Sequence, residues 1–556
     1  MRKPFPSKSE WRELAIPLLW AVAAGLVFRF AFPRFEQAWI APFAMVPFLV
    51  QLPGRSRKVA GWIGFGFGLA YFWPNLFWLN TLTYVNPAAP LGVLFMASVC
   101  ALCPAFFAIC VARSWHRGAI WPVLFAPSLW TAIEYIRSLS EWGFPWLYVG
   151  HTQATVPPMI QICDLTGVYG VSFVLVAVNV ALARMWLWWR DRSGHVFPAF
   201  AVGLGAGLVV LNLAYGFYRL NSSPELREGD PLRVAMIQPG IDQATKLGSY
   251  DYRDAELARK LQSKMLSRYK ALLVDVYNRR QDAGLPKADL YILPESAITF
   301  PYFSASQPHL DLMHEWSQLV DGPIFFGANR FAPLEGADPA TDRYYTEAEL
   351  YNSAWLATPE GGVMMRAYDK MHLVPFGEYG SYLDFIPGFT RYILGIGNFT
   401  PGKKVQRYEV DDARFGCVIC FESCFPYLFR KYTRLGVDWM LVITNDAWYL
   451  ESTGARRHQL QSVFRAIETR RPVVRVANTG ISCLIDSRGR ILESIPMNLQ
   501  QGTAQTVEVP IHSGDGMTIY MRRFGEWFSL LCLAYSVGMM IWWLKSGRQK
   551  KETAEE

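Results

Sequence analysis

The sequence predicts two structural classes in one chain: a multi-pass α-helical membrane bundle and an α/β domain. Long apolar runs dominate residues 1–220, and one more occupies residues 526–544. Between them, short β-prone runs alternate with amphipathic helical stretches, which is the pattern of an α/β layer fold. The chain has 556 residues, too many for one compact core, so at least two units are expected.

The composition is typical of a chain that lies partly in lipid. It is 52% hydrophobic with 21 tryptophans, and its 18% of charged residues is low for a soluble protein. The net charge of +8 does not indicate a nucleic-acid partner, because many basic residues sit in short turns between apolar segments. The nine cysteines have neither the spacing of a disulfide framework nor that of a zinc site, so we expect no metal.

The apolar runs predict seven transmembrane helices in a membrane domain of residues 1–220. The predicted spans cover residues 14–32, 38–52, 59–80, 90–112, 120–138, 165–188 and 198–218. Each is close to the length that crosses about 30 Å of hydrocarbon, although the second is short. No small-residue cleavage site follows the first span, so we expect it to be retained rather than removed as a signal peptide.

Basic residues in the turns predict the orientation of the spans. They precede the first span and follow the second, fourth and sixth: Arg2, Lys3, Lys8, Arg12, Arg55, Arg57, Lys58, Arg113, Arg117, Arg190 and Arg192. The intervening turns, such as residues 86–89, are nearly free of lysine and arginine, and only Arg29 and Arg34 depart from the pattern. The positive-inside rule therefore places the amino terminus in the cytoplasm and residue 220 outside.

Residues 221–520 have ordinary polarity and predict a second domain. A strand within residues 232–239 leads into a loop, and a helix is expected at about residues 253–280. Further strands are predicted at residues 289–293, 323–328, 352–357, 415–420, 438–444, 473–477 and 481–485. Strands that alternate with helices indicate an α/β layer fold.

The last segment, residues 521–556, predicts an eighth transmembrane helix and a cytoplasmic tail. Its apolar run at residues 526–544 is followed directly by four basic residues, Lys545, Arg548, Lys550 and Lys551. These return the chain to the cytoplasm, in agreement with the orientation of the first seven spans. The second domain is then tethered at both ends to the outer face of one membrane.

Three reactive side chains follow predicted strands. Cys420 ends the apolar run 415–419, Glu295 follows the run 290–293, and Lys370 follows a third β-like run. Side chains at the carboxyl ends of strands can project into a crevice above the sheet. A base, a cation and a thiol would form one site there if the three strands are neighbours. A free thiol is little ionised at neutral pH, so Cys420 needs such a base or cation to act as a nucleophile.

Each of these residues also has an unreactive interpretation. A free cysteine in an apolar run is often a buried structural residue, and most strand-end glutamates and lysines are simply solvated. His372 and His458 raise the alternative of a Cys–His pair, although such histidines are more often hydrogen-bonded structural residues.

The sequence motifs around these residues resemble those of a known family. LPES, YDKMHLVPFGEY, CFES, TNDAW and RAIETRRPVVRVANTGIS look like the motifs of the apolipoprotein N-acyltransferase family, within the nitrilase superfamily. The resemblance covers nearly the whole chain. It implies a nitrilase-like αββα sandwich in residues 221–520 and a triad of Glu295 as base, Lys370 as cation and Cys420 as nucleophile. It implies no cofactor and no metal.

The resemblance also suggests supporting residues. Glu378 resembles an additional carboxylate that supports the triad, and the backbone N–H of Phe421 is a second oxyanion donor beside Lys370. Glu422 matches another family glutamate. Glu378 or Glu422 either orients Lys370, binds the attacking amine, or forms a structural ion pair. Trp448 resembles a residue of the lipid-binding face, the alternative being a packed aromatic.

The chain departs from the family pattern in three places. Leu450 stands where a glycine usually follows the aromatic pair, Leu247 where a tryptophan is frequent, and Arg456-Arg457 replace a proline-containing step. These changes concern loop shape and lipid contacts rather than the triad. In the membrane domain, Glu134 and Arg137 lie three residues apart within family-like words, and we expect a structural and lipid-positioning function for them.

The resemblance implies an acyl transfer at a bacterial inner membrane, with the catalytic domain in the periplasm. The donor is a phospholipid, typically phosphatidylethanolamine at its first acyl position, and Cys420 takes the acyl chain as a thioester. The acceptor is the α-amino group of a diacylglyceryl-modified amino-terminal cysteine of an apolipoprotein. Two alternatives are a membrane-tethered amidase or nitrilase, in which water takes the acyl group, and a transporter or receptor that does not need Cys420.

Overall fold

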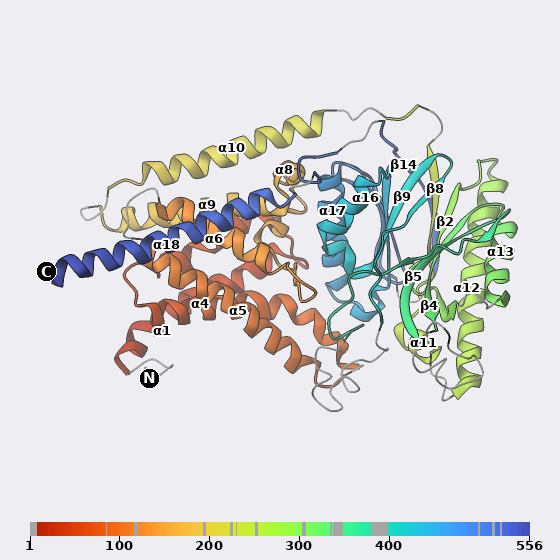
Figure 1. The fold of residues 1–556 in the computed structure, drawn as a ribbon, viewed down its shortest axis with the longest axis horizontal. Coiled ribbons are helices and arrows are strands. Elements are labelled where there is room, and N and C mark those ends of the chain that lie inside the picture. The colour runs from red at the N-terminus through yellow and green to blue at the C-terminus, as the bar shows by residue number, and fades with distance from the viewer. Residues whose placement is uncertain are drawn as a thin grey trace. The chain divides into compact units, whose positions relative to one another are not determined.

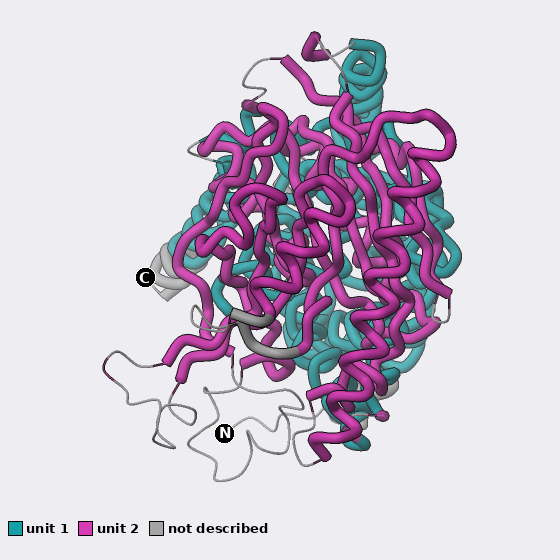
Figure 2. Tube along the Cα trace, turned by 90° about the vertical axis from the view of Figure 1, so that its right-hand side faces the viewer, with its two compact units in different colours: residues 1–83, 87–222, 518–556 teal, residues 84–86, 223–517 magenta. Residues whose placement is uncertain are grey.

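The computed structural model divides into two compact units, which Figure 2 colours separately. The first comprises Met1–Thr83, Pro87–Ser222 and Thr518–Glu556, and the second comprises Tyr84–Asn86 and Ser223–Met517. The structure describes residues 8–84, 86–115, 121–192, 196–222, 226–228, 231–250, 254–302, 307–333, 336, 348–379, 399–498, 501–513, 517–522 and 525–555. Arg2, Lys3 and Arg117, which contribute to the predicted orientation, lie outside these ranges.

The first unit is a helical bundle that includes the carboxy-terminal helix. Its elements are α1 (Lys8–Val27), η1 (Phe28–Ala31), η2 (Ala38–Ile40), α2 (Ala41–Ala44), α3 (Val46–Leu49), α4 (Arg57–Leu76), η3 (Phe77–Tyr84), α5 (Ala89–Ser114), α6 (Trp121–Ile136), η4 (Val149–Gln153), α7 (Pro157–Ile160), α8 (Cys163–Thr166), α9 (Val168–Arg190), α10 (Ala199–Asn221) and α18 (Trp527–Glu555). Helix α4 packs on α1 and α5, and α6 packs on α9 and α18.

Helical structure occupies every predicted span, but the second is not one helix. Residues 38–49 form three short pieces, because Pro42 and Pro47 each stand in the first turn of a new helix. Proline has no N–H to donate and disrupts the preceding helical turn. The predicted span 165–188 is divided in a similar way at Gly167, whose φ of +65° separates α8 from α9.

Five helices of the described chain are long and apolar enough to cross a membrane. They are Glu13–Ala31, Ala89–Ser114, Val168–Arg190, Ala199–Asn221 and Trp527–Ser546. Ala38–Leu49 and Val123–Ile136 are apolar but shorter, and α4 is not among the five. The predicted number of eight spans therefore stays a prediction.

Glu134 and Arg137 both hold the segment that follows α6. The Glu134 carboxylate accepts hydrogen bonds from Val149 N at 2.7 Å and from Trp130 Nε1 at 2.9 Å. Arg137 donates to the Trp146 carbonyl at 2.8 Å, and its guanidinium lies over the Tyr148 ring. These contacts support the predicted structural function of the two residues, because they fix residues 146–149 within the bundle.

The second unit contains two mixed β-sheets. The first sheet has the order β14 (Thr503–Val509), β1 (Leu232–Gln238), β2 (Leu290–Ile292), β4 (Ile324–Ala332), β5 (Glu349–Thr358) and β6 (Gly362–Val363), with β3 (Ile298–Tyr302) paired to β4 and β7 (Tyr368–Asp369) paired to β5. The second has the order β13 (Ile491–Ile495), β12 (Ser482–Ile485), β11 (Val473–Ala477), β10 (Trp439–Thr444), β9 (Ala413–Ile419) and β8 (Arg407–Val410).

Helices cover the outer face of each sheet, which gives the predicted αββα layers (Figure 1). Helices α12 (Ala255–Asp282) and α13 (Gln307–Leu319) pack on the first sheet, and α16 (Pro426–Arg434) and α17 (Gly454–Thr469) pack on the second. Aromatic rings join the inner faces: Phe325 of β4 lies 5.4 Å from Phe415 of β9, which stacks on Trp439 of β10 at 4.6 Å. The fold class predicted for this domain is confirmed.

The predicted apolar strands are present to within a few residues, and β7 lies at the end of the β-like run predicted before Lys370. Strands β3, β6, β8, β13 and β14 were not predicted. Strands β6 and β7 have only two residues each. Strands β8 and β13 lie at the edges of their sheet: β8 alternates exposed and buried residues, and β13 is largely exposed. A short or exposed strand has no apolar run that would reveal it.

Strand β9, which leads to Cys420, depends on a close approach at Gly416. The Tyr432 ring lies against Gly416 so closely that an added Cβ would overlap it, and the Tyr432 hydroxyl donates to the Cys417 carbonyl at 2.6 Å. We expect Gly416→Ala to reduce the stability of the second unit by about 1–3 kcal/mol, the usual cost of overpacking a core. Thermal unfolding of the detergent-solubilised protein measures this loss.

Gly361→Ala is the matched control. Gly361 lies in an exposed turn, and a Cβ there would approach only the Thr358 side chain. We expect a change within about 0.5 kcal/mol, as for most surface substitutions. Equal unfolding temperatures for the two variants would contradict the packing constraint at Gly416.

Candidate active site

The three predicted residues come from two sheets, not from neighbouring strands. Glu295 follows β2, and Lys370 follows β7 of the same sheet, with β4 and β5 between those strands. Cys420 begins η7 (Cys420–Cys424) directly after β9 of the second sheet. The three strands are therefore not all neighbours, and the candidate site assembles where the two sheets face each other.

Lys370 is the buried cation at the centre of this cluster. Its ammonium donates to Glu378 Oε1 at 2.8 Å and lies 3.6 Å from Glu295 Oε1, and the side chain is 1% exposed. Burial by itself lowers the pKa of Lys370, but Glu378, Glu295 and Cys420 together raise it above the usual value. Lys370 is therefore positively charged throughout the neutral pH range.

Glu295 is held by hydrogen bonds to both of its carboxylate oxygens. Asn352 Nδ2 donates to Oε1 at 2.8 Å, and the backbone N–H of Asn445 donates to Oε2 at 2.8 Å. Asn352 also donates to Glu378 Oε1 at 3.1 Å, while the Val374 N–H donates to Glu378 Oε2. The two carboxylates are thus fixed on either side of Lys370. Asn352 and Asn445 were not predicted, although Asn445 lies within the TNDAW word.

Cys420 occupies a strained turn in a buried environment. Its φ is +54°, a left-handed conformation that is uncommon for a residue with a side chain. Burial raises the pKa of the Cys420 thiol well above its usual value, the charge of Glu295 raises it further, and Lys370 opposes the increase. The resting group is therefore a thiol, and it needs a base at the moment of reaction.

Glu422 connects the loop that follows Lys370 to the η7 turn that begins with Cys420. The fully buried carboxylate accepts from the backbone N–H groups of Met371, His372 and Ile419 at 2.7, 3.0 and 2.7 Å. The Tyr368 hydroxyl lies 2.8 Å from both oxygens. Burial raises the pKa of Glu422 to about 7, although Lys370 and these hydrogen bonds lower it.

The other two predicted supporting residues are Phe421, which lies within η7, and Trp448, which lies after β10. Phe421 is 7% exposed, and its ring packs against Phe425 with the centroids 5.0 Å apart. Trp448 is half-buried in η8 (Asp446–Tyr449), which follows β10. The oxyanion function of the Phe421 N–H and the lipid-contact function of Trp448 stay predictions.

The two histidines bind neighbours other than the Cys420 sulfur. His458 Nε2 lies 3.0 Å from the Cys420 carbonyl oxygen and 2.9 Å from Ser423 Oγ, while its Nδ1 lies 2.8 Å from Asp446 Oδ1. His372 Nδ1 is 3.1 Å from the Tyr427 hydroxyl. These contacts favour a structural function for both rings over a Cys–His pair.

Cys420, Asp446 and His458 offer potential metal-ligand atoms within 4.8 Å of one another. However, Arg475 pairs with Asp446 at 2.7 Å, and its guanidinium lies 3.0 Å from His458 Nδ1. A cation at this distance repels a metal ion, so the arrangement fits an ion pair better than a metal centre. The absence of a metal stays a prediction.

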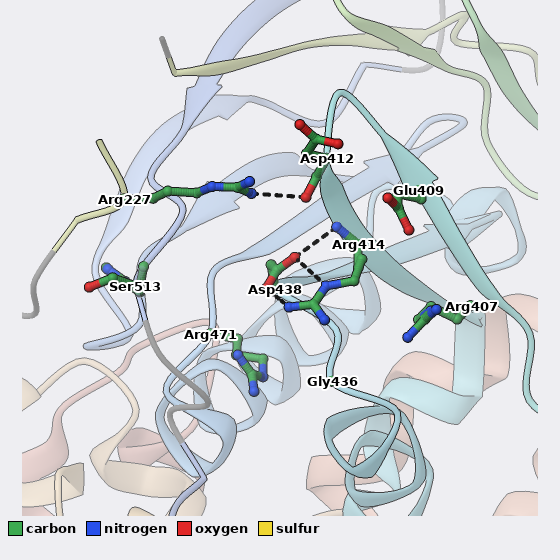
Figure 3. A pocket seen from close by; sticks show the side chains of 10 residues that line it. Arg227, Arg407, Glu409, Asp412, Arg414, Gly436, Asp438, Arg471 and Ser513 are labelled. Carbon is green, nitrogen blue, oxygen red and sulfur yellow. Dashed lines mark hydrogen bonds and ion pairs between the residues drawn. The ribbon is translucent and has the colours of Figure 1, made fainter. Parts of the chain in front are cut away.

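A surface pocket of about 800 Å³ lies at the other end of the same strands (Figure 3). Its residues include Arg414 at the beginning of β9 and Asp438 just before β10, which form an ion pair at 2.9 Å. Cys420 follows the last residue of β9, so this pocket is not part of the candidate active site. The ion pair instead joins the amino ends of two parallel strands.

Comparison with known proteins agrees with this architecture. The family model described as apolipoprotein N-acyltransferase N-terminal domain matches residues 24–181, and the carbon-nitrogen hydrolase model matches residues 233–515. An apolipoprotein N-acyltransferase from Geobacter metallireducens is 35% identical, with 93% of each chain covered. The chain belongs to the apolipoprotein N-acyltransferase family.

A second apolipoprotein N-acyltransferase and one solved structure are also similar to this chain. An apolipoprotein N-acyltransferase from Brucella melitensis is 32% identical, over 84% of this chain and 85% of its own. An amidase from Nesterenkonia sp. is 16% identical, with a TM-score of 0.35, over 55% of this chain and 98% of its own. The match of both family models supports an enzyme that combines a membrane part with a nitrilase-like part.

The backbone conformation at Leu450 shows why glycine suits this position in the apolipoprotein N-acyltransferase pattern. Leu450 ends η8 with φ of +46° and ψ of −146°, a conformation that glycine adopts without strain. We expect Leu450→Gly to stabilise the second unit by about 1 kcal/mol, because relief of about 1–3 kcal/mol of strain exceeds the conformational-entropy cost of glycine. Thermal unfolding in detergent measures the gain.

Leu435→Gly is the control for this prediction. Leu435 also follows a helix and is 40% exposed, close to the 39% of Leu450, but its φ is −81°. Glycine should therefore destabilise position 435 by about 0.5–1 kcal/mol. Destabilisation at both positions would show that Leu450 carries no relevant strain.

Proposed function

We propose that this protein transfers a fatty acyl chain from a membrane phospholipid to the α-amino group of the amino-terminal diacylglyceryl-cysteine of apolipoproteins. The observation that carries the proposal is the buried Glu295–Lys370–Glu378 cluster electrostatically coupled to Cys420. Family membership makes the chain an acyltransferase with lipid and lipoprotein substrates and a membrane location. Phosphatidylethanolamine as the donor is part of the proposal.

The first half-reaction forms a thioester on Cys420. Glu295 takes the thiol proton, and the sulfur attacks the carbonyl carbon of the phospholipid ester. The oxyanion that develops is stabilised by the Lys370 ammonium and by the Phe421 N–H. Collapse breaks the bond to the glycerol oxygen, which receives the proton from Glu295 and leaves as a lysophospholipid.

The second half-reaction transfers the acyl group to nitrogen. The α-amino group attacks the thioester carbonyl, gives a proton to Glu295, and forms an amide as the C–S bond breaks. The proton on Glu295 then returns to the sulfur, which restores the resting thiol. No cofactor or metal is required by this proton balance.

The supporting carboxylates have separate functions in this proposal. Glu378 fixes Lys370 through the 2.8 Å contact between its carboxylate and the ammonium. Glu422 is a positioning residue, since its oxygens accept hydrogen bonds on both the Lys370 side and the Cys420 side. Trp448 would contact lipid near the site.

The alternative of a membrane-tethered amidase keeps the same residues and lets water take the acyl group. It is not favoured, because the relatives that match nearly the full length are apolipoprotein N-acyltransferases and the amino-terminal model belongs to that family. Phospholipid-dependent acylation of a diacylglyceryl lipopeptide, with little hydrolysis, distinguishes the two reactions.

We expect incubation with phosphatidylethanolamine to add one fatty-acyl mass to the protein. The adduct should be labile to hydroxylamine, because a thioester reacts with that nucleophile. Intact-mass spectrometry of the wild type and of Cys420→Ala checks this assignment. Cys417→Ala is a control, because Cys417 is a buried free cysteine in β9, three residues before Cys420, and has no function in the proposed reaction. An adduct that persists in Cys420→Ala would exclude Cys420 as the acyl carrier.

We expect Glu295→Gln to slow thioester formation by about 10²–10⁴-fold, the usual effect of losing a general base. Lys370→Met should cost at least about 10²–10³-fold, because it removes an oxyanion donor. Lys370→Arg should not restore activity, since a planar guanidinium does not replace a compact ammonium between two carboxylates. Single-turnover thioester formation measures each rate. A wild-type rate of thioester formation, with only aminolysis impaired, would show that the residue has another function.

The proposed topology places the second unit in the periplasm of a bacterial inner membrane. The basic turns predict this orientation for eight spans, with the domains 1–220 and 521–556 in the membrane or cytoplasm. We expect a reporter fused near residue 300 to be periplasmic and one at residue 556 to be cytoplasmic. Both reporters on the same side would contradict an eight-span arrangement.

A further inference from the structure

A second buried lysine, Lys246, lies beside the proposed base and has no part in the steps above. It belongs to the short helix α11 (Gln243–Gly248), which follows β1, and it is 2% exposed. Its ammonium donates to the backbone carbonyl of Glu295 at 2.9 Å. A fully buried ammonium is unfavourable unless charges or hydrogen bonds nearby compensate for the lost water.

The charges that act on Lys246 are those of the proposed reacting groups. Burial lowers the pKa of Lys246 to about 8, while Glu295 and Cys420 oppose that decrease. The ammonium form therefore prevails at neutral pH. A neutral amide would satisfy the Glu295 carbonyl equally well, so the hydrogen bond alone does not require a cation at this position.

Helix α11 holds the proposed base through a second connection. Gln243 Oε1 accepts from the side chain of Asn445 at 3.0 Å, and the backbone N–H of Asn445 binds Glu295 Oε2. The same helix thus acts on the backbone of Glu295 through Lys246 and on its carboxylate through Gln243 and Asn445. A displacement of α11 would therefore move both the backbone and the carboxylate of Glu295.

We propose that Lys246 is a positioning residue that fixes the Glu295 backbone and whose positive charge favours the thiolate form of Cys420 during proton transfer. When the proton moves from Cys420 to Glu295, the negative charge moves from the carboxylate to the sulfur. Both the Glu295 carboxylate and the Cys420 sulfur interact with the Lys246 ammonium. The negative charge therefore keeps a positive partner throughout the proton transfer. Lys370, which follows β7, contacts the substrate oxyanion in the proposed reaction, whereas Lys246 acts through Glu295 and the sulfur. The inference rests on the proposed function of Cys420 as nucleophile.

The test is the rate at which iodoacetamide alkylates Cys420 between pH 6 and pH 10. The full chain in detergent is used, and peptide mass spectrometry distinguishes Cys420 from the other eight cysteines. The variants are Lys246→Gln, which keeps a donor for the Glu295 carbonyl, Lys246→Met, which keeps only the stem, and Lys246→Arg, which keeps the charge. Lys403→Met, at an exposed position, is the control. The other titratable or charged groups that act on or lie against Cys420 are unchanged in every variant: Glu295, Lys370, Asp446, Tyr449, His458 and Arg475.

We expect Lys246→Gln and Lys246→Met to slow alkylation at pH 7 at least tenfold. The difference from the wild type should shrink above pH 8, because Lys246 itself loses its charge there. Lys403→Met should match the wild type, and Lys246→Arg should recover part of the rate. A purely structural lysine would change the unfolding temperature without this pH-dependent difference in rate. A wild-type rate at pH 7 in the folded Gln variant would overturn the proposal, even if the Met variant did not fold.

The alkylation assay needs no phospholipid, so its outcome is separate from that of the proposed function. If the wild type forms no acyl adduct but the alkylation profile still depends on Lys246, the proposed reaction is wrong and the electrostatic inference stands. If the acyl adduct forms and Lys246→Gln alkylates like the wild type, only the present inference fails.

Discussion

The buried charge cluster around Lys370 is the interaction on which the rest of the second unit depends. An ammonium and two carboxylates out of water are tolerated only when each charge has a partner and the remaining oxygens accept hydrogen bonds. Glu378 and Glu295 supply the partners, and Asn352 binds both carboxylates. Because Asn445 of the second sheet binds the remaining Glu295 oxygen, the cluster is complete only when the two sheets are packed together.

The η7 turn, which begins with Cys420, depends on the same packing. A residue with φ of +54° is strained, and such strain persists only where the surroundings determine the backbone from several sides. Glu422 binds the backbone before Cys420 and the loop after Lys370, while His458 lies against the Cys420 carbonyl. The strain is therefore maintained by buried polar groups from β9, η7, α17 and the loop after β7.

Burial also determines the protonation state of the Cys420 thiol at rest. Desolvation raises the pKa of Cys420 more than Lys370 lowers it, so the sulfur rests protonated beside Glu295, the carboxylate proposed to remove its proton. A protonated thiol is a poor nucleophile toward adventitious electrophiles, and its activation is confined to the moment when the base acts. This arrangement suits an enzyme that holds a thioester until an amine arrives.

The two-part organisation, the apolar strands and the residues of the candidate triad could be predicted from the sequence. Apolar runs reveal buried strands and membrane helices directly, and the motifs around Glu295, Lys370 and Cys420 are local in sequence. The strands that meet around the candidate site could be identified only in the folded protein. Strand β7 has only two residues, and the contacts of Asn352, Asn445 and Lys246 join segments that are distant in the chain. Such pairings arise from the packing of two sheets, a long-range property for which no local pattern provides a signal.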